Sequence, residues 1–425
     1  MLHLLTASLL FAVGRLQLMP AQFDDNGIGA FASDGYIYLN EISHLKDVLK
    51  TRGIAAWIDE PSQLHLKLYA LAFAPISRWS NPNVLAIEPL NLVYYLIILL
   101  LVFKLGEEVF DRKTGLIAAV IVSVWPSFLL HSTQLVRDPL LIAAVLAFVF
   151  FITTWLRRDC SWQRGLTAGA VAGLAAVVIW IVRLAMWDVV RAVTYLGFVF
   201  LVIQQLRMRR VVVGSLLGSL LLIVIVTIIP LNGGLFAAQQ NSIIVGHGPS
   251  IAEEAKDEPL WERVAKRRRG FTGSSEGDSP VPSSNIDPEI EFHSLVDIIR
   301  YLPRAAVIGF FSPFPKMWLT SGRQVGLYGR VLSGFETLIT YVLECLALVG
   351  LWRRWNSLAE WLVALIIVIG FVGLGLIVNN IGSLYRTRYS FWMLLVVLAA
   401  GGVSYVFAAC GEQERDFKLP YSKSN

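Results

Sequence analysis

Two long apolar runs, at 114–130 and 140–156, restrict how this chain can fold more than any other feature of its sequence. Each run is long enough to cross a lipid bilayer as a helix. Only the polar segment 131–139 separates them, and Arg137 and Asp138 stand within it. Ionisable groups at a membrane boundary are costly to hold beside lipid and commonly mark functional sites. We therefore expect Asp138 to belong to a functional site at the ends of two membrane spans.

Composition extends this expectation to the whole chain. Of its 425 residues, 56% are hydrophobic and 16% are charged, whereas soluble proteins carry about 25% charged residues. Long continuous apolar runs exclude an outer-membrane barrel, whose strands give short alternating segments. The sequence predicts an all-α polytopic membrane protein with about ten transmembrane helices. They are expected at 1–19, 88–105, 114–130, 139–156, 165–183, 188–206, 211–230, 333–352, 358–378 and 389–409.

The short loops between these runs differ in charge. Lysine and arginine residues gather in alternate loops, at 104–113, 157–164, 207–210 and 353–354. Basic short loops face the cytoplasm, so these loops and the C-terminal tail are predicted to be cytoplasmic. The outer face then receives 22–83, 131–138, 186–187, 231–332 and 379–388.

Three parts follow from this arrangement. An N-terminal transmembrane module, 1–230, has a first outer loop, 20–87, that carries the candidate catalytic acids. A long outer segment, 231–332, is expected to be mobile over 246–292, which is rich in Gly, Ser, Pro and Glu, and to pack at the membrane surface over 293–332. The basic run at 266–269 is expected to be a solvated or lipid-touching patch. A C-terminal transmembrane module, 333–425, ends in a short cytoplasmic tail.

Two carboxylates on the outer face are candidates for chemistry. Asp34 precedes a flexible glycine and a helical pattern at 42–52 that is typical of a helix lying in the membrane interface. Asp34 is the better candidate for a general base, with helix N-capping as the alternative. Asp138 directly precedes Pro139, so a normal helix start is the alternative for it. Together the two carboxylates are also the candidate ligands of a divalent cation.

Basic residues on the same face indicate an anionic ligand. Arg386 and Arg388 open the last span, and Arg side chains suit bidentate contacts with phosphate. The alternative for this pair is an interfacial anchor flanked by tyrosines. The further candidates for substrate contacts are Tyr36, His131, Arg137, Arg183, Arg304 and Lys316. The chain has no Gly-rich phosphate loop, HExxH or GxSxG motif, which disfavours nucleotide and hydrolase chemistry.

This pattern resembles the polytopic glycosyltransferases of the GT-C class. The resemblance rests on Asp34 followed by Tyr36 and an interfacial helix, and on Arg137-Asp138-Pro139 at the start of an inward-running span. It covers mainly residues 1–160, with weaker similarity at 303–315 and 386–388. The most similar members are bacterial family-39-like enzymes, relatives of the protein mannosyltransferases and of the lipid A aminoarabinose transferase.

The resemblance implies an inverting transfer, on the outer face, of a sugar from a polyprenyl-phosphate donor to a hydroxyl of a glycan, lipid or protein. It implies that Asp34 is the catalytic base, that Asp138 positions the acceptor or a metal ion, and that Arg386 and Arg388 bind the donor phosphate. The chain departs from the family in lacking a clear Asp-Glu or Glu-X-Asp pair in the first loop. A requirement for Mg²⁺ or Mn²⁺ is therefore open.

Two other functions fit a polytopic chain with a large outer loop. An O-antigen ligase or polymerase, using a polyprenyl-diphosphate glycan, would depend on His247, His293, Arg300 and Arg304. A lipid-linked-sugar transporter would show internal repeats and polar residues deep within its spans. Under every alternative the partners are membrane lipids and not nucleic acid. The expected location is the bacterial inner membrane, with the active site facing outward.

Overall fold

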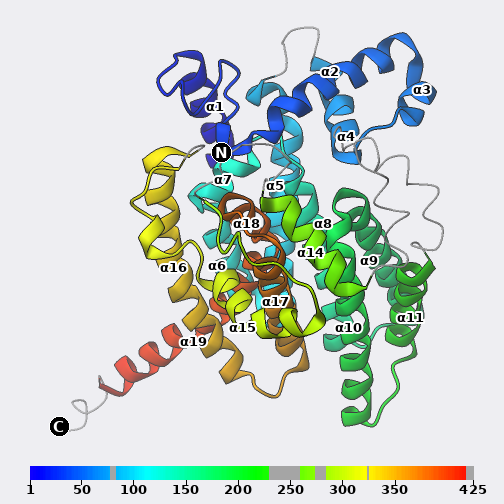
Figure 1. The fold of residues 1–425 in the computed structure, drawn as a ribbon. Coiled ribbons are helices and arrows are strands. Elements are labelled where there is room, and N and C mark those ends of the chain that lie inside the picture. The colour runs from blue at the N-terminus through cyan, green and yellow to red at the C-terminus, as the bar shows by residue number, and fades with distance from the viewer. Residues whose placement is uncertain (77–82, 229–258, 273–283, 323–324, 418–425) are drawn as a thin grey trace, which may run out of the picture.

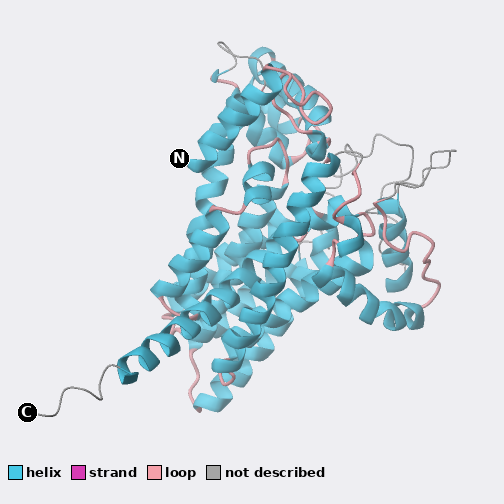
Figure 2. Ribbon diagram, turned by 90° about the vertical axis from the view of Figure 1, so that its left-hand side faces the viewer, coloured by secondary structure: helices cyan, strands magenta, loops and turns pink. Residues whose placement is uncertain are grey.

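The computed structural model describes residues 1–76, 83–228, 259–272, 284–322 and 325–417, with side chains through residue 407. Within these ranges the regular structure is helical, and the β-type contacts are isolated bridges such as that of Phe23 with Gly29. The long helices run side by side, and the end of the last helix projects from one end of the bundle (Figure 2). The prediction of an all-α polytopic fold is confirmed.

Seven helices in the described part of the chain are long and apolar enough to cross a membrane. They are α5 (Val84–Val109), α8 (Asp138–Arg157), α9 (Trp162–Val182), α10 (Trp187–Met208) with the 3-10 turn η3 (Leu184–Met186) before it, α16 (Gly326–Arg353), α17 (Leu358–Ile377) and α19 (Tyr389–Phe417). An eighth crossing would be the pair α6 (Arg112–Ser123) and α7 (Pro126–Ser132), whose axes differ by 69°. Pro126 starts α7, as prolines commonly start helices.

The two remaining predicted spans are also helical, but they are shorter. The helix α1 (Leu2–Arg15) has 14 residues and α11 (Val213–Ile228) has 16, fewer than the ~20 that a bilayer usually requires. Glycines bring α11 and α9 into close contact, since a Cβ added to Gly165 would lie 1.9 Å from the carbonyl oxygen of Gly214. Small residues allow helix backbones to approach in this way.

The centre of the bundle is formed by α8 and α19. In both helices 72% of the apolar window is buried, the highest share among the spans. Both are hydrophobic around most of their circumference, as expected for a helix surrounded by other helices. Their N-termini therefore mark a place where side chains meet deep inside the protein and yet close to one end of it.

Short helices cover that end of the bundle. They are η1 (Ala30–Ala32), α2 (Asp34–Thr51), α3 (Gly53–Asp59) and α4 (Leu64–Phe73). Figure 1 shows α2, α3 and α4 together at the top of the view. Helix α2 buries Tyr38, Ile42, Leu45 and Val48 along one face and exposes Lys50 on the other. This amphipathic arrangement agrees with the interfacial helix expected from the sequence.

The rest of the described chain adds α14 (Leu260–Thr272), α15 (Leu295–Phe311), η5 (Pro315–Met317) and α18 (Ile381–Thr387). Helix α14 lies within the segment predicted to be mobile, and most of the remainder of that segment is outside the described residues. The basic run in α14 was expected to be solvated, which is wrong for Arg268. Its side chain is 3% exposed and donates to backbone carbonyl oxygens of Leu376 and Asp287.

The basic loops lie at the opposite end of the bundle from α2. Glu360 is fully buried there and pairs with Arg157 at 3.5 Å and Arg354 at 3.7 Å. Arg158 pairs with Glu108 of α5. The loops that the basic-loop rule assigns to one face are thus neighbours in space, while Asp138 stands at the other end of α8.

Candidate active site

One arginine joins the two predicted carboxylates. Arg386 of α18 donates from Nη2 to Asp34 Oδ2 at 2.7 Å, and its Nε lies 2.9 Å from Asp138 Oδ2. The Asp138 side chain is 5% exposed and that of Asp34 is 39% exposed. The negative charge of Asp138, and to a lesser extent that of Asp34, raises the pKa of Arg386. Asp34 is thus the carboxylate that a ligand in solution or in the membrane interface can reach.

Neither carboxylate acts as a helix cap. Ser33 and Arg137 occupy the N-cap positions of α2 and α8, and neither helix has a side-chain cap hydrogen bond. Asp138 lies in the first turn of α8, where the helix dipole favours a negative charge. The capping alternative is therefore wrong for Asp34, and for Asp138 only the dipole contribution remains.

Arg386 in α18 and Arg388, the C-cap residue of that helix, point in different directions. Residues two apart on a helix point to different sides, so Arg386 and Arg388 do not share a ligand. Arg388 is 3% exposed, and its Nη1 donates to the carbonyl oxygen of Ser312 at 2.8 Å, with longer contacts to those of Gly309 and Phe310. It satisfies the C-terminal carbonyls of α15, which lack partners inside their own helix.

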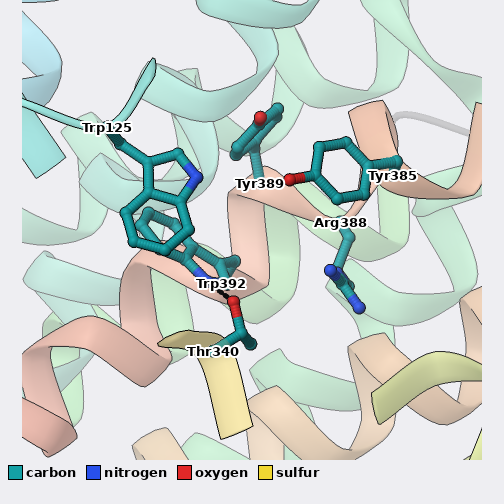
Figure 3. A pocket seen from close by; sticks show the side chains of 6 residues that line it. All are labelled: Trp125, Thr340, Tyr385, Arg388, Tyr389 and Trp392. Carbon is teal, nitrogen blue, oxygen red and sulfur yellow. Dashed lines mark hydrogen bonds between the residues drawn. The ribbon is translucent and has the colours of Figure 1, made fainter. Parts of the chain in front are cut away.

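Arg388 also lines a small cavity of about 10 Å³, which is room for one water. The other lining residues are Trp125, Thr340, Tyr385, Tyr389 and Trp392 (Figure 3). Beside it, the buried Glu336 of α16 accepts hydrogen bonds from Ser127 and Tyr385. This polar cluster ties α7, α16 and α18 together and so fixes the position from which Arg386 extends.

Three other predicted residues surround the pair of carboxylates. Arg183 lies 4.0 Å from Asp138, at the break between α9 and η3. The charges of Asp138 and Arg386 act on His131, whose Nδ1 contacts the carbonyl oxygen of Ser127 at 2.7 Å. Arg137 is half-buried, and its Nε has no hydrogen-bond partner among the described residues.

Three predicted residues make their contacts elsewhere. The Tyr36 hydroxyl donates to the carbonyl oxygen of Ile28 at 3.2 Å. Arg304 forms a bidentate pair with Asp287, at 2.9 and 3.0 Å. The hydrogen bond from Arg304 is the main cause that lowers the pKa of Asp287. Lys316 is exposed in η5.

Gln134 connects the two acidic segments, and the sequence did not point to it. It is fully buried, and its Oε1 accepts from the backbone N–H of Gly29 at 2.9 Å while its Nε2 donates to the carbonyl oxygen of Gly27 at 3.4 Å. Gly29 precedes η1, which leads directly to Asp34, and Gln134 lies four residues before Asp138. The only sequence signal was its position in the short polar segment between two spans.

His65 was also missed, because it stands in a short apolar run. It is 1% exposed, and neither ring nitrogen has a hydrogen-bond partner within the described chain. The edge of its ring meets Tyr38 of α2, with centroids 4.9 Å apart. The charges of Arg137, Asp34, Asp138 and Arg386 all act on Tyr38, so His65 and Tyr38 adjoin the charged site.

The arrangement does not suit a divalent cation held by the two carboxylates. The Arg386 guanidinium occupies the position between Asp34 and Asp138 that a cation would need. In the described ranges, no three His, Cys, Asp or Glu side chains are grouped closely enough to hold a metal ion. We therefore derive no chemical step through a metal.

Comparison with known proteins bears on the same part of the chain. Residues 78–231 match the family described as dolichyl-phosphate-mannose-protein mannosyltransferase. The chain resembles the GT-C class of membrane glycosyltransferases. The resemblance expected from the sequence is thereby confirmed. The matched residues include Arg137, Asp138 and Arg183, whereas Asp34 and Arg386 lie outside them.

Among solved structures, the chain is similar to the archaeal oligosaccharyltransferase AglB from Archaeoglobus fulgidus, in complex with an inhibitory peptide and a dolichol-phosphate. The identity is 15% and the TM-score is 0.42, over 85% of this chain and 44% of that protein. The chain thus spans less than half the length of AglB. No curated protein matches the chain.

Proposed function

We propose that this protein transfers a sugar from a polyprenyl-phosphate donor to an acceptor hydroxyl, at the end of the bundle where α8 begins. The observation that carries this proposal is the contact of Arg386 with Asp34 and Asp138. In this contact the Asp34 side chain remains partly exposed, so an acceptor hydroxyl can reach its carboxylate. The match to the mannosyltransferase family over 78–231 supports the same class of reaction.

The charge balance of the site favours a donor with one negative charge. Two carboxylates face the three guanidinium groups of Arg137, Arg183 and Arg386, which leaves one excess positive charge. A sugar linked to a polyprenyl phosphate is a phosphodiester with a single negative charge, whereas a diphosphate carries two. An unpaired charge of either sign in a poorly hydrated site is costly, so the phosphodiester is the better match.

We propose that the donor phosphate is bound by arginines other than Arg386 and Arg388, which the sequence had suggested. Arg386 is engaged by two carboxylates and Arg388 by backbone carbonyl oxygens. Nε of Arg137 makes no hydrogen bond to any described residue, and the ion pair that Arg183 forms among the described residues is a 4.0 Å contact with Asp138. We therefore assign the donor phosphate to Arg137 and Arg183, whose guanidinium groups suit phosphate oxygens.

The reaction then needs only groups of this chain. Asp34 accepts the proton of the acceptor hydroxyl while the hydroxyl oxygen bonds to the anomeric carbon of the sugar. The bond from that carbon to the phosphate oxygen breaks, and polyprenyl phosphate leaves with the electron pair. Arg137 and Arg183 stabilise the added charge on the departing phosphate. Attack from the side opposite the leaving group inverts the sugar carbon. Asp138 holds Arg386, which in turn orients Asp34.

The location of the reaction follows from the basic loops. They gather at the end opposite Asp138, and basic short loops face the cytoplasm. We assign the acidic end to the outer face, of a bacterial inner membrane. The polyprenyl chain then lies in the bilayer while its phosphate reaches the boundary at which α8 begins. A ligase of the alternative class would use Arg304, which here is paired with Asp287.

The test is sugar transfer by the purified protein, with a panel of polyprenyl-phosphate sugars as donors and wild type compared with Asp34→Asn and Arg137→Gln. Asp34→Asn is expected to lower kcat by roughly 10²-fold or more, since general-base catalysis contributes about that much. Arg137→Gln should raise KM for the donor and also lower kcat. Turnover should persist in EDTA, because Arg386 stands where a cation would bind.

Arg210→Gln is the matched control, because Arg210 is an exposed arginine paired with Asp159 near the basic loops. It should leave both kinetic constants unchanged. Full activity of Asp34→Asn in folded protein would refute the assignment of the base. Turnover only with polyprenyl-diphosphate donors would refute the donor class, and loss of turnover in EDTA would refute the metal-free site.

A further inference from the structure

Buried polar atoms without partners gather at the start of α8. They are both ring nitrogens of His65, both carboxylate oxygens of Asp138, Nε of Arg137 and Nε of Arg386, each lacking a hydrogen bond to any described residue. Arg386 Nε and Asp138 Oδ2 are 2.9 Å apart, so they attract by charge, although the N–H does not point along a hydrogen bond. Buried polar groups normally have partners, and each exception calls for an explanation.

These atoms belong to one place. The charge of Arg137 acts on His65, and the ring of Tyr38 contacts the His65 ring. The charges of Arg137, Asp138 and Arg386 also act on the Tyr38 hydroxyl. Tyr38 comes from α2, His65 from α4 and Arg137 from the N-cap of α8. Three separate elements thus bring these residues together, and His65 and Nε of Arg137 have no hydrogen-bond partner among the described residues.

The protonation of His65 determines what this point can recognise. Burial, followed by the repulsion of Arg137, lowers the pKa of His65 to about 3. The imidazole is therefore neutral at physiological pH and offers one N–H donor and one nitrogen acceptor. Asp138 adds acceptors, and Arg137 and Tyr38 add donors.

Within this set only Arg137 suits a phosphate, because phosphate oxygens only accept hydrogen bonds, whereas Asp138 and one nitrogen of His65 are themselves acceptors. A hydroxyl group both donates and accepts, and neighbouring hydroxyls on a sugar ring present such pairs side by side. A phosphodiester on Arg137 and Arg183 also places the attached sugar next to the arginines. The sugar ring then comes within reach of His65 and Asp138.

We propose that His65, together with Tyr38 and Asp138, forms the subsite that binds hydroxyl groups of the transferred sugar. His65 is the specificity-determining member, because its neutral ring accepts from one hydroxyl and donates to another. This inference rests on the proposed function, since it takes the lipid-linked sugar as the ligand. It extends that function by separating the recognition of the sugar from the recognition of the phosphate.

The experiment measures binding of two probes to the purified protein in detergent. One probe is undecaprenyl phosphate, and the other is undecaprenyl phosphate carrying mannose, glucose, galactose or arabinose. The sugar-dependent gain in affinity is the ratio of the two dissociation constants for the best sugar. His65→Leu is expected to reduce this gain by about tenfold, the equivalent of roughly one to two hydrogen bonds, and to leave the affinity for undecaprenyl phosphate unchanged.

Two further variants make the test specific. His65→Gln keeps one donor and one acceptor and should restore part of the gain. Tyr94→Phe removes a hydroxyl that is also buried and without a partner in the described chain, in the same apolar cluster as Tyr38. This control should change neither affinity.

The outcomes separate the two proposals. If wild type binds neither probe, the donor class of the proposed function is wrong. If wild type shows the gain and His65→Leu retains it, the subsite is wrong while the function stands. A structure with bound donor in which the His65 nitrogens contact only water would also overturn the subsite.

Discussion

Removal of the Arg386 charge tests how the carboxylates are held. In Arg386→Met, Asp138, whose side chain is 5% exposed, loses the guanidinium 2.9 Å away. Breaking a buried ion pair from one side costs roughly 3–5 kcal/mol. Arg183, at 4.0 Å, can offset part of this loss. We therefore expect a destabilisation near the lower end, about 3 kcal/mol.

Asp34→Asn should behave differently, although Asp34 contacts the same arginine. Its side chain is 39% exposed, and ion pairs open to solvent contribute only about 0–1 kcal/mol. The variant Asp34→Asn should therefore be close to wild type in stability while it loses turnover. In Arg386→Met/Asp138→Asn no buried carboxylate is left without its arginine at this site, so the double variant should be more stable than the sum of the single changes predicts.

The assay is thermal unfolding in detergent at one fixed scan rate, because unfolding of large proteins is commonly irreversible. The midpoint of Arg386→Met should fall by something on the order of 5 °C, and that of Asp34→Asn by much less. The reasoning fails if Asp34→Asn is as unstable as Arg386→Met. It also fails if the double variant shows a fully additive loss.

Two other predictions follow from the buried contacts. Gln134→Leu removes the hydrogen-bond acceptor of the Gly29 N–H, so the Gly29 amide should exchange faster with solvent and kcat should fall with little change in KM. Thr133→Val, a change at a neighbouring buried residue, should alter neither quantity. Unchanged amide exchange in Gln134→Leu would contradict the role of the Gln134–Gly29 hydrogen bond. The pair with Arg304 lowers the pKa of Asp287 in the folded state below the ordinary value of 3.8. The pair therefore stabilises the fold fully above pH 3.8, and this stabilisation is lost as the pH falls through the folded-state pKa. Unfolding midpoints between roughly pH 2 and 4.5 should therefore fall more steeply with decreasing pH in wild type than in Arg304→Gln, and equal slopes would contradict this.

The sequence predicted most of what the membrane dictates. All ten apolar runs are helical where the structure describes them, and the polar segments 20–87 and 131–138, predicted for the outer face, carry the two acids that the structure brings to one arginine. A bilayer imposes a minimum length and an apolar composition on every span, so each span can be recognised from its own stretch of sequence. The angle between α6 and α7, and the short lengths of α1 and α11, depend on packing against other helices, which no local run encodes.

The partners of the charged residues were much harder to predict. Arg386 and Arg388 look equivalent in the sequence, but one extends to carboxylates and the other to backbone carbonyls. Arg304 forms an ion pair with Asp287. Arg268 is buried, although it belongs to a basic run whose sequence is typical of a solvated patch. Charge alone shows that a residue is costly to bury. It does not show which oxygen the fold supplies to compensate that cost.

The contact between Asp34 and Arg386 joins residues 352 positions apart. Asp34 is synthesised before α5, and Arg386 only after six of the seven long apolar helices in the described chain have been made. Until then, Asp138 and Asp34 must enter the membrane boundary without their common arginine. The nascent chain therefore holds the two acids without the arginine that joins them, so the site is assembled only after α18 has been made. Chains that stop short of α18 would be inactive however well their first spans fold.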